Sequence, residues 1–315
     1  MNETIASGMT SPRILIPFAI ITLIWGSTWL VITGQIGIVS PSWSVTYRFL
    51  IGGVIMLGYA RLMGQSLRLG SSGHAFAAIF GVAQFVFNFN FVYRAELHIT
   101  SGLVAVVFAL LVVPNAILGR IFLGTEVSRR FITGSLVAFF GVAILFTNEL
   151  RNDIANNGAT LLGVALTLAG VMSASIANIM QASPRAKAMP MASLLGWGML
   201  WGTAINACFS WITTGPPTIE YSPTYIAGLL YLGVMASAVA FTLYFGVIRA
   251  IGPAKAAYSS VLIPIIAMGL STVFEGYTWS LLAASGGIIT LIGMFIALSS
   301  NRAKAVIKDS QPSEI

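Results

Sequence analysis

Charged side chains are scarce in this chain. Asp, Glu, Lys and Arg make up 8% of its 315 residues, against about a quarter in a typical soluble domain. Hydrophobic residues make up 57%. A chain with so little charge cannot cover itself with polar surface, so its solvent has to be lipid. The composition therefore excludes a soluble globular domain.

Residues that build disulfides, metal sites and catalytic centres are also few. The single cysteine, Cys208, falls within an apolar run, which excludes a disulfide framework and a thiolate metal site. The two histidines, His74 and His98, lie near the ends of apolar runs without a carboxylate beside them at depth. A membrane-embedded enzyme needs a nucleophile with its base, an aspartate pair or metal ligands there. We therefore predict a protein that is not an enzyme and holds neither cofactor nor metal.

What the chain has instead is a series of ten apolar runs. Each is close to the roughly 20 residues that a helix needs to cross about 30 Å of hydrocarbon. Continuous runs also exclude a membrane barrel, because barrel strands alternate apolar and polar residues. We predict an all-α polytopic membrane protein with ten spans, at 14–33, 44–59, 74–93, 99–118, 131–147, 160–181, 189–213, 225–247, 254–274 and 279–299.

The basic residues between these runs alternate sides. The loops on one side, together with both termini, hold thirteen Lys and Arg; the other loops hold two, and Arg48 is embedded. The positive-inside rule then places both termini in the cytoplasm. The net charge of +7 belongs to these loops, without the aromatic-studded groove of a nucleic-acid-binding protein. We expect a multi-pass protein of the bacterial inner (plasma) membrane, with the bilayer and no nucleic acid as partner. The oligomeric state stays open and is compatible with a monomer.

The two halves of the chain repeat. Gly102 and Pro114 are twelve residues apart, as are Gly252 and Pro264. Five spans per half make the second copy insert upside down, which is common in secondary transporters with a mid-membrane site. We predict a tail at 1–12, two units at 13–148 and 159–300, a linker at 149–158 and a second tail at 301–315. Pro114 and Pro264 are candidate hinges, because proline breaks a helix ladder; the alternative is a static kink.

The first span contains Trp25-Gly26-Ser27-Thr28, which resembles the opening of EamA-type members of the drug/metabolite transporter superfamily. The segment 96–102 leading into the Pro114 helix, and the glycine spacing of the fifth and tenth spans, add to the resemblance. It covers nearly the whole chain as two EamA units, although the second unit lacks Trp-Gly-Ser in its first span. The resemblance implies export of small metabolites or drugs, with amino acids prominent among the substrates.

The predicted spans carry no Asp or Glu near mid-depth, because Glu126 lies at one end of a span while Glu96 and Glu275 fall near the outer surface. Intramembrane carboxylates commonly relay protons or bind sodium. We therefore predict facilitated diffusion or exchange by alternating access, without a buried acidic coupling site. Arg48 is expected to snorkel to the interface or to pair with Glu96 or Glu275. Because the predicted spans offer neither a carboxylate at mid-depth nor more than one basic residue well inside them, we expect a zwitterionic or neutral substrate with an apolar part.

Uncharged polar and aromatic side chains are left to recognise such a substrate, since polar atoms in lipid have to face protein or water. For each of them the alternative is a hydrogen bond between helices. We predict a secondary transporter that exports amino acids; a broad drug or metabolite efflux carrier is the alternative, and a channel ranks below it because no filter-like sequence is present. The candidate substrate-binding residues are Trp25, Gln84, Asn88, Ser175, Asn178, Tyr244, Tyr258 and Ser259.

Overall fold

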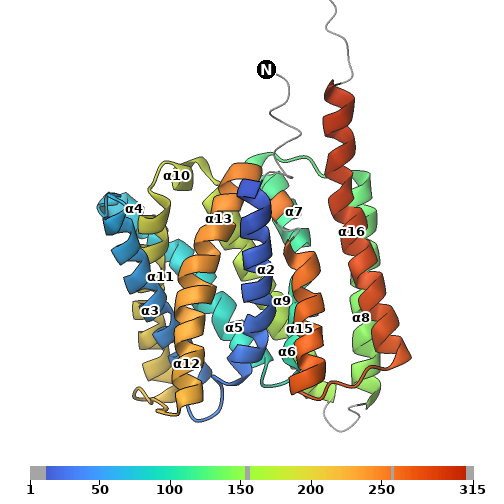
Figure 1. Ribbon diagram of the computed structural model, residues 1–315, viewed down its shortest axis with the longest axis horizontal. Coiled ribbons are helices and arrows are strands. Elements are labelled where there is room, and N and C mark those ends of the chain that lie inside the picture. The colour runs from blue at the N-terminus through green and yellow to red at the C-terminus, as the bar shows by residue number, and fades with distance from the viewer. Residues whose placement is uncertain (1–11, 153–156, 257–258, 310–315) are drawn as a thin grey trace, which may run out of the picture.

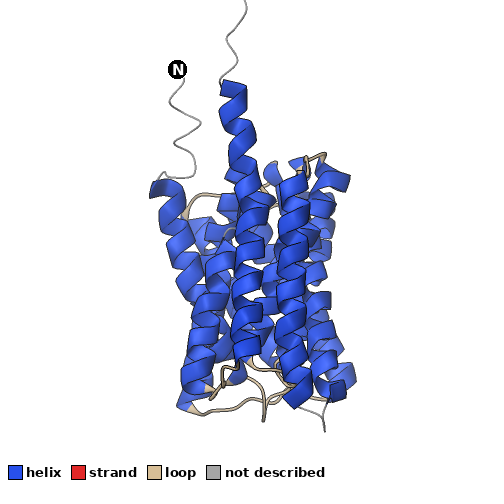
Figure 2. Cartoon of the chain, turned by 90° about the vertical axis from the view of Figure 1, so that its right-hand side faces the viewer, coloured by secondary structure: helices blue, strands red, loops and turns tan. Residues whose placement is uncertain are grey.

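A computed structural model describes residues 12–152, 157–256 and 259–309, and every regular element in this part of the chain is a helix. The helices run alternately up and down in one bundle (Figures 1 and 2). Helix α2 (Pro12–Thr33) begins at the same face of the bundle at which α16 (Leu281–Asp309) ends (Figure 1). We call this face the terminal face. The all-α prediction is confirmed, and the assignment of the terminal face to the cytoplasm stays a prediction.

Seven helical spans in the described part are long and apolar enough to cross a bilayer. Each overlaps one of the predicted spans, and most extend it by a few residues at one or both ends. The seven are Ile14–Thr33, Pro41–Leu62, Gly70–Ala95, Ser101–Leu123, Arg129–Thr147, Gly158–Ala182 and Pro223–Ile251.

The three other predicted spans are helical as well. Helix α11 (Met191–Thr214) has 24 residues. Helix α15 (Ser259–Phe274) contains the shorter apolar stretch Leu262–Phe274, and α16 contains Leu281–Ala297. A count of ten membrane crossings stays a prediction.

Serine–proline pairs begin two of the long spans. The Ser40 side chain accepts a hydrogen bond from a first-turn amide of α3 (Pro41–Leu62), and Ser222 does the same for α12 (Pro223–Tyr231). The serine satisfies an amide that has no partner within the helix. The proline that follows has no amide hydrogen to satisfy, and its fixed φ suits the first helical position. Both helices therefore start at a defined residue.

Two spans that the sequence predicts as uniform α-helices contain a π-helical segment. The wider turn is rare and occurs frequently at functional sites. The third span consists of α4 (Gly70–Gly81), the π-helix η1 (Val82–Phe87) and α5 (Asn88–Ala95). The eighth consists of α12, the π-helix η3 (Leu232–Val239) and α13 (Ala240–Ile251).

The fourth span is also interrupted, and a proline lies beside the interruption. It consists of α6 (Ser101–Phe108), the 3₁₀ turn η2 (Ala109–Leu111) and α7 (Val112–Leu123). Pro114, in the first turn of α7, cannot donate to the carbonyl four residues earlier. Helix α15 continues through Pro264. The hinge role of both prolines stays a prediction.

Close glycine contacts hold the two ends of the elongated bundle. At one end α8 (Arg129–Asn152) packs against α16 (Figure 1), and a Cβ added to Gly134 would lie 2.2 Å from the Ala297 amide nitrogen. At the other end α11 packs against α3 and α4, and a Cβ on Gly81 would lie 2.1 Å from the Gly198 carbonyl oxygen. Small residues let helix backbones approach this closely in membranes.

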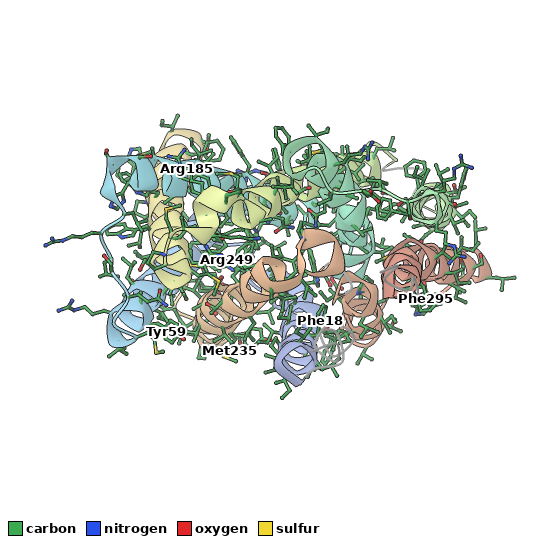
Figure 3. The ribbon with its side chains drawn as sticks, turned by 90° about the horizontal axis from the view of Figure 1, so that it is seen from above. Phe18, Tyr59, Arg185, Met235, Arg249 and Phe295 are labelled. Carbon is green, nitrogen blue, oxygen red and sulfur yellow. The ribbon has the colours of Figure 1, made fainter. Side chains whose placement is uncertain are left out.

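The middle of the bundle is built from α2, α5, α6, α13, α15 and α9 (Asn157–Ala182). Two short helices, α10 (Pro184–Lys187) and α14 (Pro253–Ala256), lie in connections between the long ones. Seen from above, Tyr59 lies toward one end of the bundle and Phe295 toward the other, with Arg249 between them (Figure 3). These central helices enclose the candidate site.

Candidate functional site

The central helices surround a cavity of about 80 Å³. Most of its wall is aromatic or aliphatic, with the rings of Trp25 and Trp29 from α2, Phe108 from α6 and Phe241 from α13. Polar side chains interrupt this wall from α2, α3, the third span, α9 and α13. An apolar chamber with a few polar groups is the usual form of a small-molecule site.

The structure brings most of the predicted site residues to this one cavity. Trp25, Gln84, Asn88, Asn178 and Tyr244 line it, although they come from four different spans. That shared location is an observation, and their role in binding a substrate stays a prediction.

The other predicted positions fall elsewhere. Ser175 is buried, and its hydroxyl has no hydrogen-bond partner in the described ranges, but the residue is not part of the cavity wall. Tyr258 and the side chain of Ser259 lie outside the described part of the structure. Pro264 lines the cavity. Pro114 is buried but is not part of the cavity wall.

Trp25 ties α2 to the eighth span. Its indole N–H donates to the Ala236 carbonyl oxygen at 3.2 Å, and Ala236 lies in the π-helix η3. The ring also meets Phe241 and Tyr244 edge-on, with centroid distances of 5.2 and 4.8 Å. Edge-to-face pairs at such distances add to the stabilisation from burial. The aromatic part of the wall is therefore held in place by contacts between elements distant in sequence.

A cluster of amides connects α7, α9 and α13. The Asn178 Nδ2 donates to Asn115 Oδ1 at 3.3 Å, and Asn178 is also a hydrogen-bond partner of Tyr244. Asn115 is not among the site residues that the sequence predicts. A polar residue directly after a mid-span proline, in an otherwise apolar run, is the signal that could have identified it.

Gln84 and Asn88 have oxygens without partners. Gln84 Oε1 and Asn88 Oδ1 are buried with no hydrogen bond in the described structure. A buried acceptor left unpaired costs about 1–3 kcal/mol, and native proteins keep few of them. Both residues lie in or directly after η1, where the nearby Ala83 carbonyl accepts from the Ser173 hydroxyl at 2.8 Å. Both residues line the cavity, and these two acceptors lack a partner among the described residues.

Arg48 also lines the cavity, and the prediction that it snorkels to the interface or forms an ion pair is wrong. Its side chain is 1% exposed. The Arg48 Nε donates to Ser237 Oγ at 3.0 Å, Nη1 donates to the Tyr93 hydroxyl at 3.4 Å, and the guanidinium lies 4.3 Å from the Phe89 ring centroid. Two neutral hydroxyl acceptors and a ring face hold the cation, so it has no need to reach the interface.

A second polar network lies apart from the cavity wall and joins α3, α5 and α11. Asn90 Nδ2 donates to Asn206 Oδ1 at 2.6 Å, and Arg94 donates to Asn90 Oδ1 at 2.6 Å and to Ser42 Oγ at 2.8 Å. Asn206 in turn donates to the Ser42 carbonyl oxygen at 2.8 Å. These groups satisfy one another, which is the helix-bracing use of polar residues in membranes.

Two glutamates meet at the face opposite the terminal face, where α15 ends and α6 begins. The Glu275 carboxylate accepts hydrogen bonds from the amide and hydroxyl of Ser101. Glu96 is 8% exposed, and neither of its carboxylate oxygens has a partner among the described residues. Burial raises the pKa of the Glu96 carboxyl well above its usual value; the charge of Glu275 raises it further, and that of Arg48 lowers it. Glu96 does not line the cavity.

A comparison with protein families matches residues 13–147 and 161–299 to the EamA-like transporter family. The chain belongs to this family. Its members are transporters, so at family level this EamA protein is a membrane transporter and the reading as an enzyme is disfavoured. The drug/metabolite transporter resemblance of the sequence is confirmed.

Curated relatives are distant but cover nearly the whole chain. The protein PagO of Salmonella typhimurium is 22% identical over 92% of this chain and 94% of its own length. A "Probable amino-acid metabolite efflux pump" of Escherichia coli K12 is 23% identical over 92% of this chain and 96% of its own. A solved crystal structure with 17% identity covers 93% of this chain at a TM-score of 0.68. At that identity the structural match shows the fold alone.

Proposed function

We propose that this EamA protein is a secondary transporter that exports small zwitterionic, partly apolar metabolites, with amino acids as the leading class, across the bacterial inner membrane. One observation carries the proposal: a central cavity combines an aromatic wall with unpaired amide oxygens of Gln84 and Asn88. Relatives named as probable amino-acid metabolite efflux pumps in Salmonella typhimurium and Escherichia coli support the same class.

Alternating access by two inverted units is part of the proposal. Each π-helical segment starts beside a glycine at a helix crossing: Gly81 lies against the backbone of Gly198, and Gly233 lies against the Arg48 carbonyl oxygen. The two crossings are related by an offset of about 150 residues, as the sequence repeat is. Equivalent irregularities in both halves of a transporter point to the region of its binding site.

The size of the cavity supports a transport cycle with a contracted state. Its 80 Å³ is smaller than the roughly 150 Å³ engineered cavity that accommodates benzene. An amino acid therefore enters only when the surrounding helices move apart. A central cavity that opens to one side and then to the other is the behaviour expected of a carrier.

Counterflow in proteoliposomes tests the proposal. Liposomes preloaded with one unlabelled amino acid should accumulate the labelled form transiently and saturably, and protein-free liposomes should not. Imposing pH and voltage gradients separately measures coupling, and we expect small effects because no carboxylate is recorded in the described cavity wall. Flux that does not saturate favours a channel, and exchange confined to hydrophobic drugs favours the broad efflux carrier; either result contradicts the proposal.

A further inference from the structure

Arg48 is a buried cation whose recorded partners are all neutral. Its hydrogen bonds go to the hydroxyls of Ser237 and Tyr93, and its guanidinium faces the ring of Phe89; no ion pair is recorded for it in the described part of the chain. A charge inside a membrane protein is costly, and such residues face a cavity or mark a substrate pathway. Arg48 does face the cavity.

The guanidinium keeps donors for a further partner. It has five N–H groups, and the two recorded hydrogen bonds use one from Nε and one from Nη1. Free N–H groups therefore remain on both terminal nitrogens. An arginine with such a free edge binds a carboxylate through two parallel, charge-assisted hydrogen bonds. The bonds to Ser237 and Tyr93, from two other spans, fix the plane of the guanidinium in advance.

The complementary acceptors lie on the same wall. Gln84 Oε1 and Asn88 Oδ1 belong to residues one helical turn apart and are unpaired within the described residues. An ammonium group carries three N–H donors and no acceptor. The cavity thus has a cationic subsite at Arg48 and an acceptor subsite on η1 and α5, with an aromatic wall around them.

We propose that Arg48 binds the carboxylate of the transported molecule, while Gln84 and Asn88 accept hydrogen bonds from its ammonium group. This assignment deepens the proposed function. It rests on that function for the direction of transport, whereas the binding of the carboxylate does not depend on it. The substrate class is then the α-amino acids, and Arg48 is the residue that selects for a free carboxylate.

Binding to the purified full-length protein tests this assignment. The probes are leucine, leucinamide, which lacks the carboxylate, and 4-methylpentanoate, which lacks the ammonium. The readout is tryptophan fluorescence, since Trp25 and Trp29 line the cavity. Wild-type protein should bind leucine more tightly than leucinamide. Arg48→Gln should lower the affinity for leucine and for 4-methylpentanoate about 10- to 100-fold, which is equivalent to the loss of one hydrogen bond to a charged group. The affinity for leucinamide should change less than threefold in Arg48→Gln. Arg48→Lys should recover part of the preference for leucine over leucinamide.

Arg94→Gln is the matched control, because Arg94 is also held by two side chains, Asn90 and Ser42, but does not line the cavity. Arg94→Gln should change the affinities for all three probes alike. Three results overturn the inference: equal wild-type binding of leucine and leucinamide, an equal loss of both in Arg48→Gln, or no saturable binding of either carboxylate-bearing probe. Arg48-dependent binding without counterflow would instead refute the proposed transport function and leave the assignment of Arg48 standing.

Discussion

At the scale of single residues, the most exceptional group outside the cavity is Glu96. It is buried, both of its oxygens lack a partner in the part of the chain that the structure describes, and the charged or titratable side chains that act on it there are Glu275, Arg48 and Tyr93. An ionised carboxylate in such a place is poorly compensated, so the folded protein binds a proton there more tightly than the unfolded chain does. Glu96 lies at the face opposite the terminal face and does not line the cavity. We therefore expect it to affect stability rather than binding.

Glu96 should make the protein less stable as pH rises. Its folded pKa is raised above the unfolded value of about 4.5, so its contribution is fully present below that value and is lost as pH rises through the folded pKa. Between the two pKa values the loss is about 1.4 kcal/mol per pH unit. The unfolding temperature in detergent should therefore fall from acid to neutral pH, and Glu96→Gln should flatten this fall and stabilise the protein at pH 8.

Glu220→Gln, in the loop between α11 and α12, serves as the control for that measurement and should keep the wild-type slope. An unchanged slope in Glu96→Gln would contradict the assignment of the pH dependence to this carboxyl.

At the residue scale, the sequence places side chains relative to one another only where the pattern is local. Gln84 and Asn88 are polar residues one turn apart in an apolar run, and helix periodicity alone places them on one face. Arg48 was misjudged because its environment comes from elsewhere: Phe89 and Ser237 surround it only after the third and eighth spans fold against α3. No sequence pattern near Arg48 predicts those partners.

At the scale of elements, the α8–α16 pair shows how glycines determine helix contact. A Cβ on Gly293 would lie 2.2 Å from the Ala138 amide nitrogen, and one on Gly141 would lie 2.4 Å from that of Thr290. Real Cβ atoms do not approach backbone so closely, so any side chain at Gly293 forces the two helices apart. The sequence predicted these glycines as a matching pair of spacings, but not that the two helices face each other.

Gly293→Ala should destabilise this helix pair, whereas Gly287→Ala on the same helix should not. Overpacking a tight contact costs typically about 1–3 kcal/mol, which corresponds to a loss of several degrees in unfolding temperature. At Gly287 a Cβ meets only a Trp279 ring atom at 4.0 Å, so alanine there should be neutral or stabilise through its helix propensity. Equal effects of the two substitutions, measured by thermal unfolding in detergent, would show that the close approach is not needed.

The irregular segments η1, η2 and η3 could not be predicted at this scale. Apolar periodicity fixes where a span lies and which residues share a face, but a π-turn differs from an α-turn by one residue in the hydrogen-bond ladder. None of the three contains a proline, and the breaker signal was present only near η2, where Pro114 follows in the first turn of α7. Tertiary crossings at Gly81 and Gly233 accompany the π segments, and these crossings are visible only in the folded chain.

At the scale of the whole molecule, the contact between Ser101 and Glu275 joins the two predicted units at the face opposite the terminal face. Ser101 begins α6 in the first unit, and Glu275 follows α15 in the second. A carboxylate at the start of a helix is favoured by the unpaired amides and the dipole there. If the carrier alternates as proposed, this contact has to break each time that face opens.

Cross-linking this contact should therefore stop transport. In a Cys208→Ser background, which removes the native cysteine, Ser101→Cys and Glu275→Cys are joined by a short bifunctional thiol reagent with a reducible spacer. Counterflow should be lost on cross-linking and restored on reduction. The same treatment of Ser42→Cys with Asn90→Cys, a contact within one predicted unit, should leave counterflow largely intact. Full counterflow in the cross-linked Ser101–Glu275 pair would mean that the substrate crosses without separating α6 from the end of α15, and alternating access at this face would then be wrong.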